Sequence, residues 1–120
     1  MNILIIGLGG IGQRYLRLLK TNFKKSNIYA LRKNKKQFEI KDNLKIDRKI
    51  NIIKKYDISV IKNIKDIKNV KLDFALITSP TSLHLKYCKE LISSEIPILI
   101  EKPLSNSYLQ AKKILDYNET

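Results

Sequence analysis

The residues Ile3-Leu4-Ile5-Ile6-Gly7-Leu8-Gly9-Gly10-Ile11-Gly12 form an apolar run that ends in closely spaced glycines. The glycines follow the spacing G-x-G-x-x-G. The first permits a tight turn, the second lets the backbone approach a pyrophosphate, and the third lets the next helix pack closely on the strand. Free N–H groups at the start of that helix then face the anion. The stretch therefore predicts a dinucleotide site, and a glycine turn in another kind of α/β protein is the alternative.

The length and composition of the chain limit the classes of protein to which it can belong. Its 120 residues suffice for one domain with a hydrophobic core, and 43% hydrophobic content is typical of a soluble globular fold. No apolar run approaches the roughly 20 residues that cross a bilayer, and the N-terminus lacks the basic segment of a signal peptide. The single cysteine, Cys88, excludes an internal disulfide and suits a reducing compartment. We therefore expect a cytoplasmic protein without a membrane segment.

The chain is strongly basic, with 24 Lys and Arg residues against 11 Asp and Glu residues and a net charge of +13. Such a charge attracts anions and raises the alternative of a basic protein that associates with nucleic acid. The lysines, however, are spread along the whole chain. The sequence also lacks the spacing of zinc ligands, of a helix-turn-helix and of an RNA-recognition motif. We therefore expect no metal site and no specific nucleic-acid partner.

Short apolar runs alternate with segments of helical periodicity, which is typical of a parallel sheet covered on both faces. The predicted strands are Asn2–Ile6, Ile28–Leu31, Asp57–Val60, Leu72–Ile77 and Ile98–Ile100. The predicted helices are Ile11–Phe23, one through Lys49–Lys55, one after Pro80 that Thr81 or Ser82 caps, and one near the end of the chain. Residues 33–56 carry the weakest pattern. We predict one α/β domain over residues 1–120, a doubly wound parallel sheet of the Rossmann dinucleotide-binding type.

Three predicted helices carry apolar residues that recur at helical spacing and are expected to face the sheet. In the first helix these residues are Ile11, Tyr15, Leu18 and Leu19. In the helix after Pro80 they are Leu83, Tyr87, Cys88, Leu91 and Ile92. In the last helix they are Tyr108, Ala111, Ile114 and Leu115. Buried in such a face, Cys88 is expected to act as a small apolar residue.

The end of the second predicted strand bears on the choice of cofactor. In a dinucleotide fold, an acidic residue about 20 positions past the glycines binds the ribose 2′-OH. Arg32 stands at that place, followed by Lys33, Lys35 and Lys36. These cations suit a 2′-phosphate, and a guanidinium can stack on adenine, so the sequence favours NADP over NAD. The alternative is that they are simply further lysines of a basic chain. The missing acid also argues against a methyltransferase that uses S-adenosylmethionine.

Three segments together resemble the glucose–fructose oxidoreductase / inositol dehydrogenase / MocA (Gfo/Idh/MocA) family. They are Gly7–Gly12, the stretch ITSPTSLH at residues 77–84, and Glu101-Lys102-Pro103-Leu104. Their order and spacing match the amino-terminal nucleotide-binding domain of that family, and the resemblance covers essentially the whole chain. It implies an NAD(P)-dependent oxidoreductase that acts on a sugar, an inositol or related polyol, or a nucleotide-linked sugar.

The resemblance also implies roles for individual residues. Thr78, Ser79 and Pro80 would line the pyrophosphate and nicotinamide side of the cofactor. Glu101 would hydrogen-bond the nicotinamide ribose. Lys102 would be the catalytic residue, because a lysine ammonium can hold the reacting oxygen and help move its proton. In this family the peptide bond before the proline that follows is often cis. A surface ion pair between Glu101 and Lys102 is the alternative.

His84 is the only histidine of the chain and falls in the first turn of a predicted helix. A histidine occurs at this place in the family, where it supports the cofactor site and the packing of the helix. Direct proton transfer by His84 is the alternative. The usual proton-transfer histidine of the family lies in a second α/β domain, for which this sequence has no counterpart.

Without that second domain, the resemblance implies an incomplete substrate pocket and missing oligomer contacts. We therefore expect the chain to be the cofactor-binding portion of such an oxidoreductase, whether a fragment, a truncated product or one half of a split enzyme. In isolation it should bind NADP and turn over little. A free-standing nucleotide-binding regulatory module is the alternative.

Overall fold

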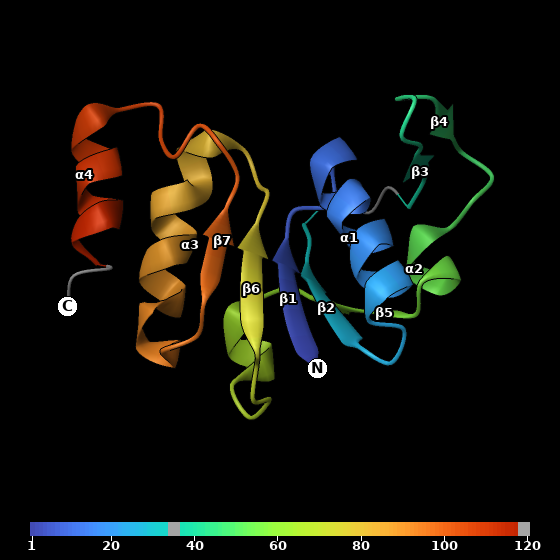
Figure 1. The fold of residues 1–120 in the computed structure, drawn as a ribbon, viewed down its shortest axis with the longest axis horizontal. Coiled ribbons are helices and arrows are strands. Elements are labelled where there is room, and N and C mark those ends of the chain that lie inside the picture. The colour runs from blue at the N-terminus through green and yellow to red at the C-terminus, as the bar shows by residue number, and fades with distance from the viewer. Residues whose placement is uncertain (34–36, 118–120) are drawn as a thin grey trace.

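A computed structural model of the chain describes residues 1–33 and 37–117. Lys35 and Lys36, which we expected beside the cofactor, lie outside these residues. The central element is a parallel sheet with the strand order β5-β2-β1-β6-β7 (Figure 1). Its strands are β1 (Asn2–Ile6), β2 (Asn27–Leu31), β5 (Ile58–Ile61), β6 (Phe74–Ile77) and β7 (Ile98–Ile100). The predicted first strand is therefore the middle strand of the sheet.

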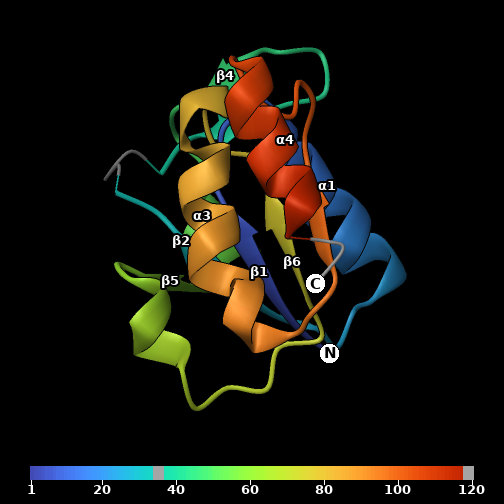
Figure 2. The same ribbon diagram turned by 90° about the vertical axis from the view of Figure 1, so that its left-hand side faces the viewer.

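Helices cover both faces of the sheet. They are α1 (Gly10–Asn22), α2 (Ile52–Lys55), α3 (His84–Leu91) and α4 (Tyr108–Asp116). Short 3₁₀ turns run over Ile64–Ile67, Thr81–Leu83 and Ile92–Ser94. In Figure 1, α1 and α2 lie to one side of the strands, while α3 and α4 lie to the other. Figure 2 shows α3 and α4 next to each other in front of the sheet.

The side chains of β1 alternate between two hydrophobic cores, one on each face of the sheet. Ile3 and Ile5 belong to the core under α1 and α2, which includes Leu16 of α1. Leu4 and Ile6 belong to the core under α3, which includes Leu91. All four of these apolar side chains are fully buried, and only Asn2 at the start of β1 is partly exposed. A strand covered on both faces reads as a continuous apolar run, and the doubly wound fold predicted from this pattern is confirmed.

Residues 39–47 form a small antiparallel hairpin, β3 (Glu39–Ile40) and β4 (Ile46–Asp47), which the sequence did not predict. Its strands are too short to carry a periodic pattern. Polar side chains from the neighbouring helices hold it instead. Arg17 of α1 donates to the carbonyl oxygen of Ile40 at 2.9 Å and pairs with Asp42 at 2.6 Å. The hairpin therefore depends on contacts between segments that are distant in the sequence.

Glu39 is the buried anchor of this hairpin, with 3% of its surface exposed. Its carboxylate accepts hydrogen bonds from Lys55 Nζ at 2.8 Å and from the Tyr56 hydroxyl at 3.1 Å. The hydrogen bond from Lys55 is the main reason why the pKa of Glu39 is lowered, and it also raises the pKa of Lys55. The ionised carboxylate therefore stabilises the folded state.

We expect Glu39→Gln to destabilise the chain at pH 7 by about 1 kcal/mol and to make its stability less sensitive to acid. A carboxyl whose pKa is lowered by folding stabilises the protein above its unfolded pKa, and this contribution disappears as the pH falls through the folded pKa. The unmutated chain should therefore lose stability below about pH 4.5, the ordinary value for a glutamate. Urea unfolding from pH 7 to pH 3 measures this loss. The control is Glu95→Gln, at an exposed glutamate, which should keep the full acid sensitivity. Equal slopes of the free energy of unfolding against pH for the two variants would contradict the prediction.

The buried face of α1 differs from the predicted one. The structure buries Gln13, Leu16 and Leu19, whereas Ile11 and Leu18 are 46% and 51% exposed. The helix begins at Gly10, one residue earlier than predicted, and Gly12 lies directly against the preceding turn. That contact sets the rotation of α1 about its axis and turns Leu18 toward solvent. The short α2 likewise covers only Ile52–Lys55 of the predicted Lys49–Lys55.

The faces predicted for the later helices are only partly correct. In α3, Tyr87, Cys88 and Leu91 are buried as expected. The flanking residues Leu83 and Ile92 are 36% and 40% exposed, because they lie in 3₁₀ turns rather than in the helix.

In α4 only Ile114 is buried, Ala111 is half-buried, and Tyr108 and Leu115 are 80% and 57% exposed. This helix packs mainly on α3, and a helix-on-helix contact covers a narrower stripe than a sheet does. The predicted inward placement of Tyr108 and Leu115 was therefore wrong.

The cap predicted for α3 was also wrong. Neither Thr81 nor Ser82 caps it, because both lie in a 3₁₀ turn that leads into the helix, and the N-cap residue of α3 is Leu83. Within this turn, the backbone N–H of Leu83 donates to the carbonyl oxygen of Pro80 at 2.9 Å. Backbone hydrogen bonds thus replace the expected side-chain cap.

Among residues 1–33 and 37–117, no helix combines the length and the apolar character that a membrane crossing requires.

Candidate functional site

The fold gathers the predicted site residues at one edge of the sheet, because parallel strands all end on the same side. The glycine turn follows β1, Arg32 follows β2, Thr78–Pro80 follow β6, and Glu101–Pro103 follow β7. β2 and β6 flank β1 on opposite sides, so the strand order reverses at β1 (Figure 1). In open α/β sheets, ligands bind in the crevice outside the carboxyl ends of the strands at such a reversal.

Two glycines of the turn are required by its packing. Gly7 has a φ of +100°, and a Cβ there would lie 2.8 Å from the backbone nitrogen of Ser79. A Cβ on Gly12 would lie 2.1 Å from the carbonyl oxygen of Gly7. By contrast, a Cβ on Gly9 would have no heavy atom of the described residues within 4 Å. The turn is therefore closely packed against β6 on one side and open at Gly9.

The open side of the turn is the start of α1. Gly9 is the N-cap residue, no side chain of the described residues caps the helix, and its first turn holds no acidic residue. The N–H groups of this turn and the positive end of the helix dipole therefore favour an anion. Thr78 fixes the turn, since its hydroxyl donates to the carbonyl oxygen of Gly7 at 2.7 Å. The neighbouring Ser79 Oγ is buried and makes no hydrogen bond within the described part of the chain.

Tyr15 links α1 to the segment after β7. Its hydroxyl donates to Glu101 Oε2 at 3.0 Å. This hydrogen bond and, to a lesser extent, burial raise the pKa of Tyr15, so the hydroxyl keeps its proton as a donor. From the sequence, Tyr15 was expected only to face the sheet, and its hydrogen bond to Glu101 was not predicted. A partly buried tyrosine hydroxyl usually finds a partner, but nothing in the local pattern identifies Glu101, which is 86 residues away.

Lys102 is exposed at the end of β7, next to Glu101. The peptide bond between Lys102 and Pro103 is cis. Among the ion pairs of the described residues, none joins Glu101 to Lys102, because Glu101 instead accepts from Tyr15. The structure thus leaves the ammonium group of Lys102 at the open edge of the sheet.

His84 is a buried histidine that connects two loops of this edge. Its Nε2 lies 3.0 Å from the carbonyl oxygen of Ser79, and its Nδ1 lies 3.1 Å from the carbonyl oxygen of Leu104. Only 1% of the residue is exposed. Both ring nitrogens are therefore engaged by main-chain oxygens, which is the supporting arrangement expected for this histidine. A direct contact between His84 and a nucleotide stays a prediction.

A cleft of about 570 Å³ opens at the ends of β2 and β5. Its lining residues are Arg32, Lys33, Gln37, Ile53, Val60, Lys62 and Asn63. Three of them are cations and two are apolar, a combination that suits a flat ring next to an anionic group. Lys62 and Asn63 were not predicted. They follow β5, and the signal that could have found them is that β5 ends at the same edge as β2.

The guanidinium of Arg32 is the distinctive group of this cleft. Its Nη1 is buried and has no hydrogen-bond partner among residues 1–33 and 37–117. Burial lowers the pKa of Arg32, although an arginine remains charged at neutral pH. Nη1 is covered, but Arg32 as a whole is only half-buried. Its guanidinium can therefore offer charge-assisted hydrogen bonds to an anionic ligand in the cleft.

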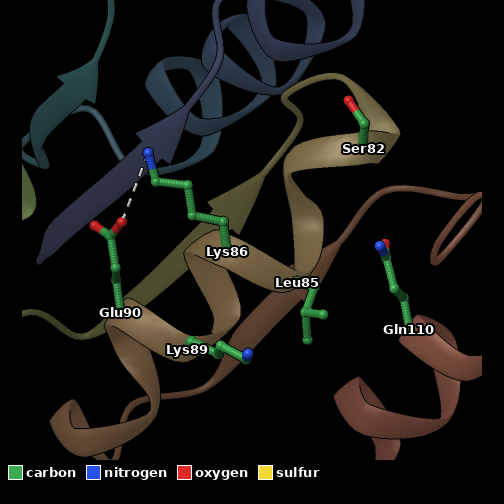
Figure 3. A pocket seen from close by; sticks show the side chains of 6 residues that line it. All are labelled: Ser82, Leu85, Lys86, Lys89, Glu90 and Gln110. Atoms are coloured by element: carbon green, nitrogen blue, oxygen red, sulfur yellow. Dashed lines mark ion pairs between the residues drawn. The ribbon is translucent and has the colours of Figure 1, made fainter.

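A second hollow, of about 480 Å³, lies on the outer surface of α3 next to α4. Figure 3 shows its lining side chains, with Lys86 paired to Glu90 at a distance of 4.0 Å. None of the predicted site residues lines this hollow. The ion pair also neutralises one of its two lysines. We therefore assign the candidate site to the carboxyl edge of the sheet.

An open glycine turn at a strand reversal, with a cationic cleft after β2, is characteristic of a dinucleotide-binding Rossmann domain. The model of one protein family, described as the oxidoreductase family with an NAD-binding Rossmann fold (GFO_IDH_MocA), matches residues 1–120. The chain therefore belongs to the Gfo/Idh/MocA family, and the resemblance drawn from its three motifs is confirmed. No curated protein matches the sequence significantly.

Solved structures of dehydrogenases and reductases share the fold. The chain resembles the WlbA dehydrogenase from Bordetella pertussis in complex with NADH and UDP-GlcNAcA, at 12% identity and a TM-score of 0.75. UDP-N-acetylglucosamine 3-dehydrogenase GnnA from Acidithiobacillus ferrooxidans has a sequence identity of 16% and a TM-score of 0.70. Biliverdin reductase from Synechocystis in complex with biliverdin and NADP⁺ has a sequence identity of 15% and a TM-score of 0.75. The matches cover 98%, 99% and 98% of this chain but 32%, 35% and 34% of those chains, so it spans about one third of their length.

Proposed function

We propose that residues 1–120 are the nucleotide-binding domain of an oxidoreductase that prefers NADP and acts on the CH–OH group of a sugar, polyol or sugar-nucleotide. The observation that carries the choice of NADP is the cleft after β2. It is lined by Arg32, whose Nη1 has no hydrogen-bond partner among the described residues, together with Lys33 and Lys62. Among the described residues, no carboxylate lines this cleft. A carboxylate at this place would favour a ribose without a 2′-phosphate.

The residues at the carboxyl edge of the sheet suit the pyrophosphate, the 2′-phosphate and the adenine ring of NADP. The open turn at Gly9 and the start of α1 would hold the pyrophosphate, with the free Ser79 Oγ as a further donor. Arg32 and Lys33 would hold the 2′-phosphate. Ile53 and Val60 would pack on the adenine ring, since they form the apolar part of the cleft. This division extends the roles that the resemblance implies.

The nicotinamide end would lie between the segments after β6 and β7. When bound, the nicotinamide dinucleotide supplies the transfer of a hydride to or from the substrate carbon. Glu101, held in place by the Tyr15 hydroxyl, would orient the adjoining ribose. Lys102 would hold the substrate oxygen with its Nζ and exchange a proton there as the oxygen gains or loses charge. His84 would keep the two segments at a fixed separation.

The proposed substrate class is supported by two of the similar structures. WlbA was solved with UDP-GlcNAcA, and GnnA is described as a dehydrogenase of UDP-N-acetylglucosamine. Biliverdin reductase, which was solved with biliverdin, has the same fold. Lys102 is exposed at the sheet edge. We therefore propose that groups outside residues 1–120 enclose the substrate and form the oligomer contacts.

The proposal is tested by calorimetric titration of the chain with NADPH and NADH, repeated on Arg32→Asp. We expect NADPH to bind at least about tenfold more tightly than NADH. Arg32→Asp should weaken NADPH binding about 100-fold, because it removes charge-assisted hydrogen bonds and adds repulsion. It should leave NADH binding similar or stronger, since an aspartate can accept from a ribose hydroxyl.

The matched control is Arg48→Asp, which changes the net charge equally at an exposed arginine outside the cleft. It should retain the preference for NADPH, which separates a specific site from general attraction to a chain of charge +13. Tighter binding of NADH by the unmutated chain would refute the NADP proposal. The same loss of NADPH binding in both variants would refute the role of Arg32.

A further inference from the structure

Gln13 is a fully buried glutamine in the first turn and a half of α1, with 1% of its surface exposed. Its Nε2 donates to the carbonyl oxygen of Leu8 at 3.1 Å and to the carbonyl oxygen of Phe38 at 3.1 Å. Its Oε1 accepts from the backbone N–H of Ile40 at 2.6 Å. One amide group thus satisfies three main-chain groups on two separate segments.

The first of these segments is the glycine turn, through Leu8. The second is the stretch 37–40, which forms a wall of the Arg32 cleft because Gln37 lines that cleft. From the other side, the carbonyl oxygen of Gln37 accepts from the backbone N–H of Ile52 at 2.9 Å, and its side chain pairs with Asn51. Hydrogen bonds therefore fix this wall to the start of α2 on one side and to Gln13 on the other.

Other contacts of this wall do not replace Gln13. Arg17 also reaches the carbonyl oxygen of Ile40, but its second partner is the exposed Asp42 rather than the turn. Glu39 ties the same stretch to Lys55 and Tyr56, which lie at and just after the end of α2. Among the side chains of residues 1–33 and 37–117, hydrogen bonds join the glycine turn to this wall through Gln13. Gln13 itself is too buried to touch a ligand.

We propose that Gln13 is a positioning residue for nucleotide selectivity. It fixes the wall of the Arg32 cleft relative to the glycine turn, and so sets the separation between the site for the pyrophosphate and the site for the 2′-phosphate. This inference rests on the proposed function. It predicts that loss of the amide weakens the binding of NADPH more than that of NADH. NADPH uses both the pyrophosphate site and the 2′-phosphate site, whereas NADH uses only the pyrophosphate site.

The test uses Gln13→Met, which keeps the length and most of the volume of the side chain but removes its hydrogen bonds. Affinities for NADPH and NADH are measured by calorimetry on the whole chain. We expect the affinity for NADPH to fall about tenfold or more and the affinity for NADH to fall clearly less. The preference for NADPH over NADH should therefore decrease. Gln110→Met is the matched control, because Gln110 lies on α4 and bonds only to Ser105 among the contacts of the described residues. It should leave both affinities unchanged.

A second variant, Gln13→Glu, keeps the acceptor for the Ile40 N–H but places a carboxylate against the carbonyl oxygens of Leu8 and Phe38. It should lower the preference in the same direction, and it decides the question if Gln13→Met does not fold. An unchanged ratio of the two affinities in a folded Gln13 variant would overturn the positioning role while leaving the proposed function intact. Absence of saturable binding of either nucleotide to the unmutated chain would overturn the proposed function itself.

Discussion

Gly12→Ala is expected to abolish the cooperative unfolding transition of this chain or to destabilise it by more than about 3 kcal/mol. The added Cβ would lie 2.1 Å from the carbonyl oxygen of Gly7 and 2.9 Å from Thr78 Oγ1. Gly7 itself lies close to the segment after β6, since a Cβ added to it would lie 2.8 Å from the backbone nitrogen of Ser79 and 2.9 Å from the carbonyl group of Thr78. The helix must therefore separate from β1, which breaks the packing of α1 on the sheet. Circular dichroism during urea and thermal unfolding measures the effect.

The matched control is Gly9→Ala in the same turn. Its Cβ would have no heavy atom of the described residues within 4 Å, and the backbone of Gly9 has φ −75° and ψ −166°, an extended conformation open to alanine. The stability of this variant should stay within about 1 kcal/mol of the unmutated chain. A Gly12→Ala chain that unfolds cooperatively at the unmutated midpoint would show that the turn and α1 do not pack as described.

The second large effect is expected from Gly9→Val, which should fold normally and bind neither NADPH nor NADH. We expect affinity to fall at least about 100-fold, because the branched side chain would fill the open space in which the phosphates must approach the N–H groups of α1. Calorimetric titration measures the affinity, and thermal unfolding checks the fold. The change thus separates binding from stability at one position.

Thr21→Val provides the control for this prediction, since it places the same side chain at an exposed position at the far end of α1. Both its stability and its affinities should match those of the unmutated chain. If Gly9→Val retained tight binding of either nucleotide, the phosphates could not lie at the start of α1. The proposed division of the edge into pyrophosphate, 2′-phosphate and nicotinamide sites would then be wrong as well.

Two parts of the candidate site follow from local sequence. The glycine turn was recognised because its spacing is dictated by sterics within six residues of chain, and its positions at Gly7 and Gly12 are closely packed as expected. Arg32 was found because it stands about 20 positions past the glycines, directly after an apolar run that forms β2 in the structure. In both cases the signal lies next to the element that positions the residue. The identity of the bound nucleotide stays a prediction.

Other parts of the site were out of reach of such reasoning. The Tyr15–Glu101 hydrogen bond joins residues 86 positions apart, and Gln13 reaches Phe38 across 25 positions. Polar side chains carry no periodicity that identifies a distant partner. The hairpin β3–β4 was missed for the same reason, since side-chain hydrogen bonds and the buried Glu39 hold it rather than an apolar face.

The order of the five strands of the parallel sheet and of the four helices along the chain, the doubly wound class and the glycine turn after β1 were all readable from the order of residues. Their physical basis is local: apolar runs, helical spacing and the steric needs of glycine act within a few residues. The rotation of α1 that buries Gln13 and exposes Leu18, and the joining of Tyr15 to Glu101, depended on the folded chain. These features arise from the close packing of Gly12 on Gly7 and from hydrogen bonds between distant segments, which exist only once the sheet has formed.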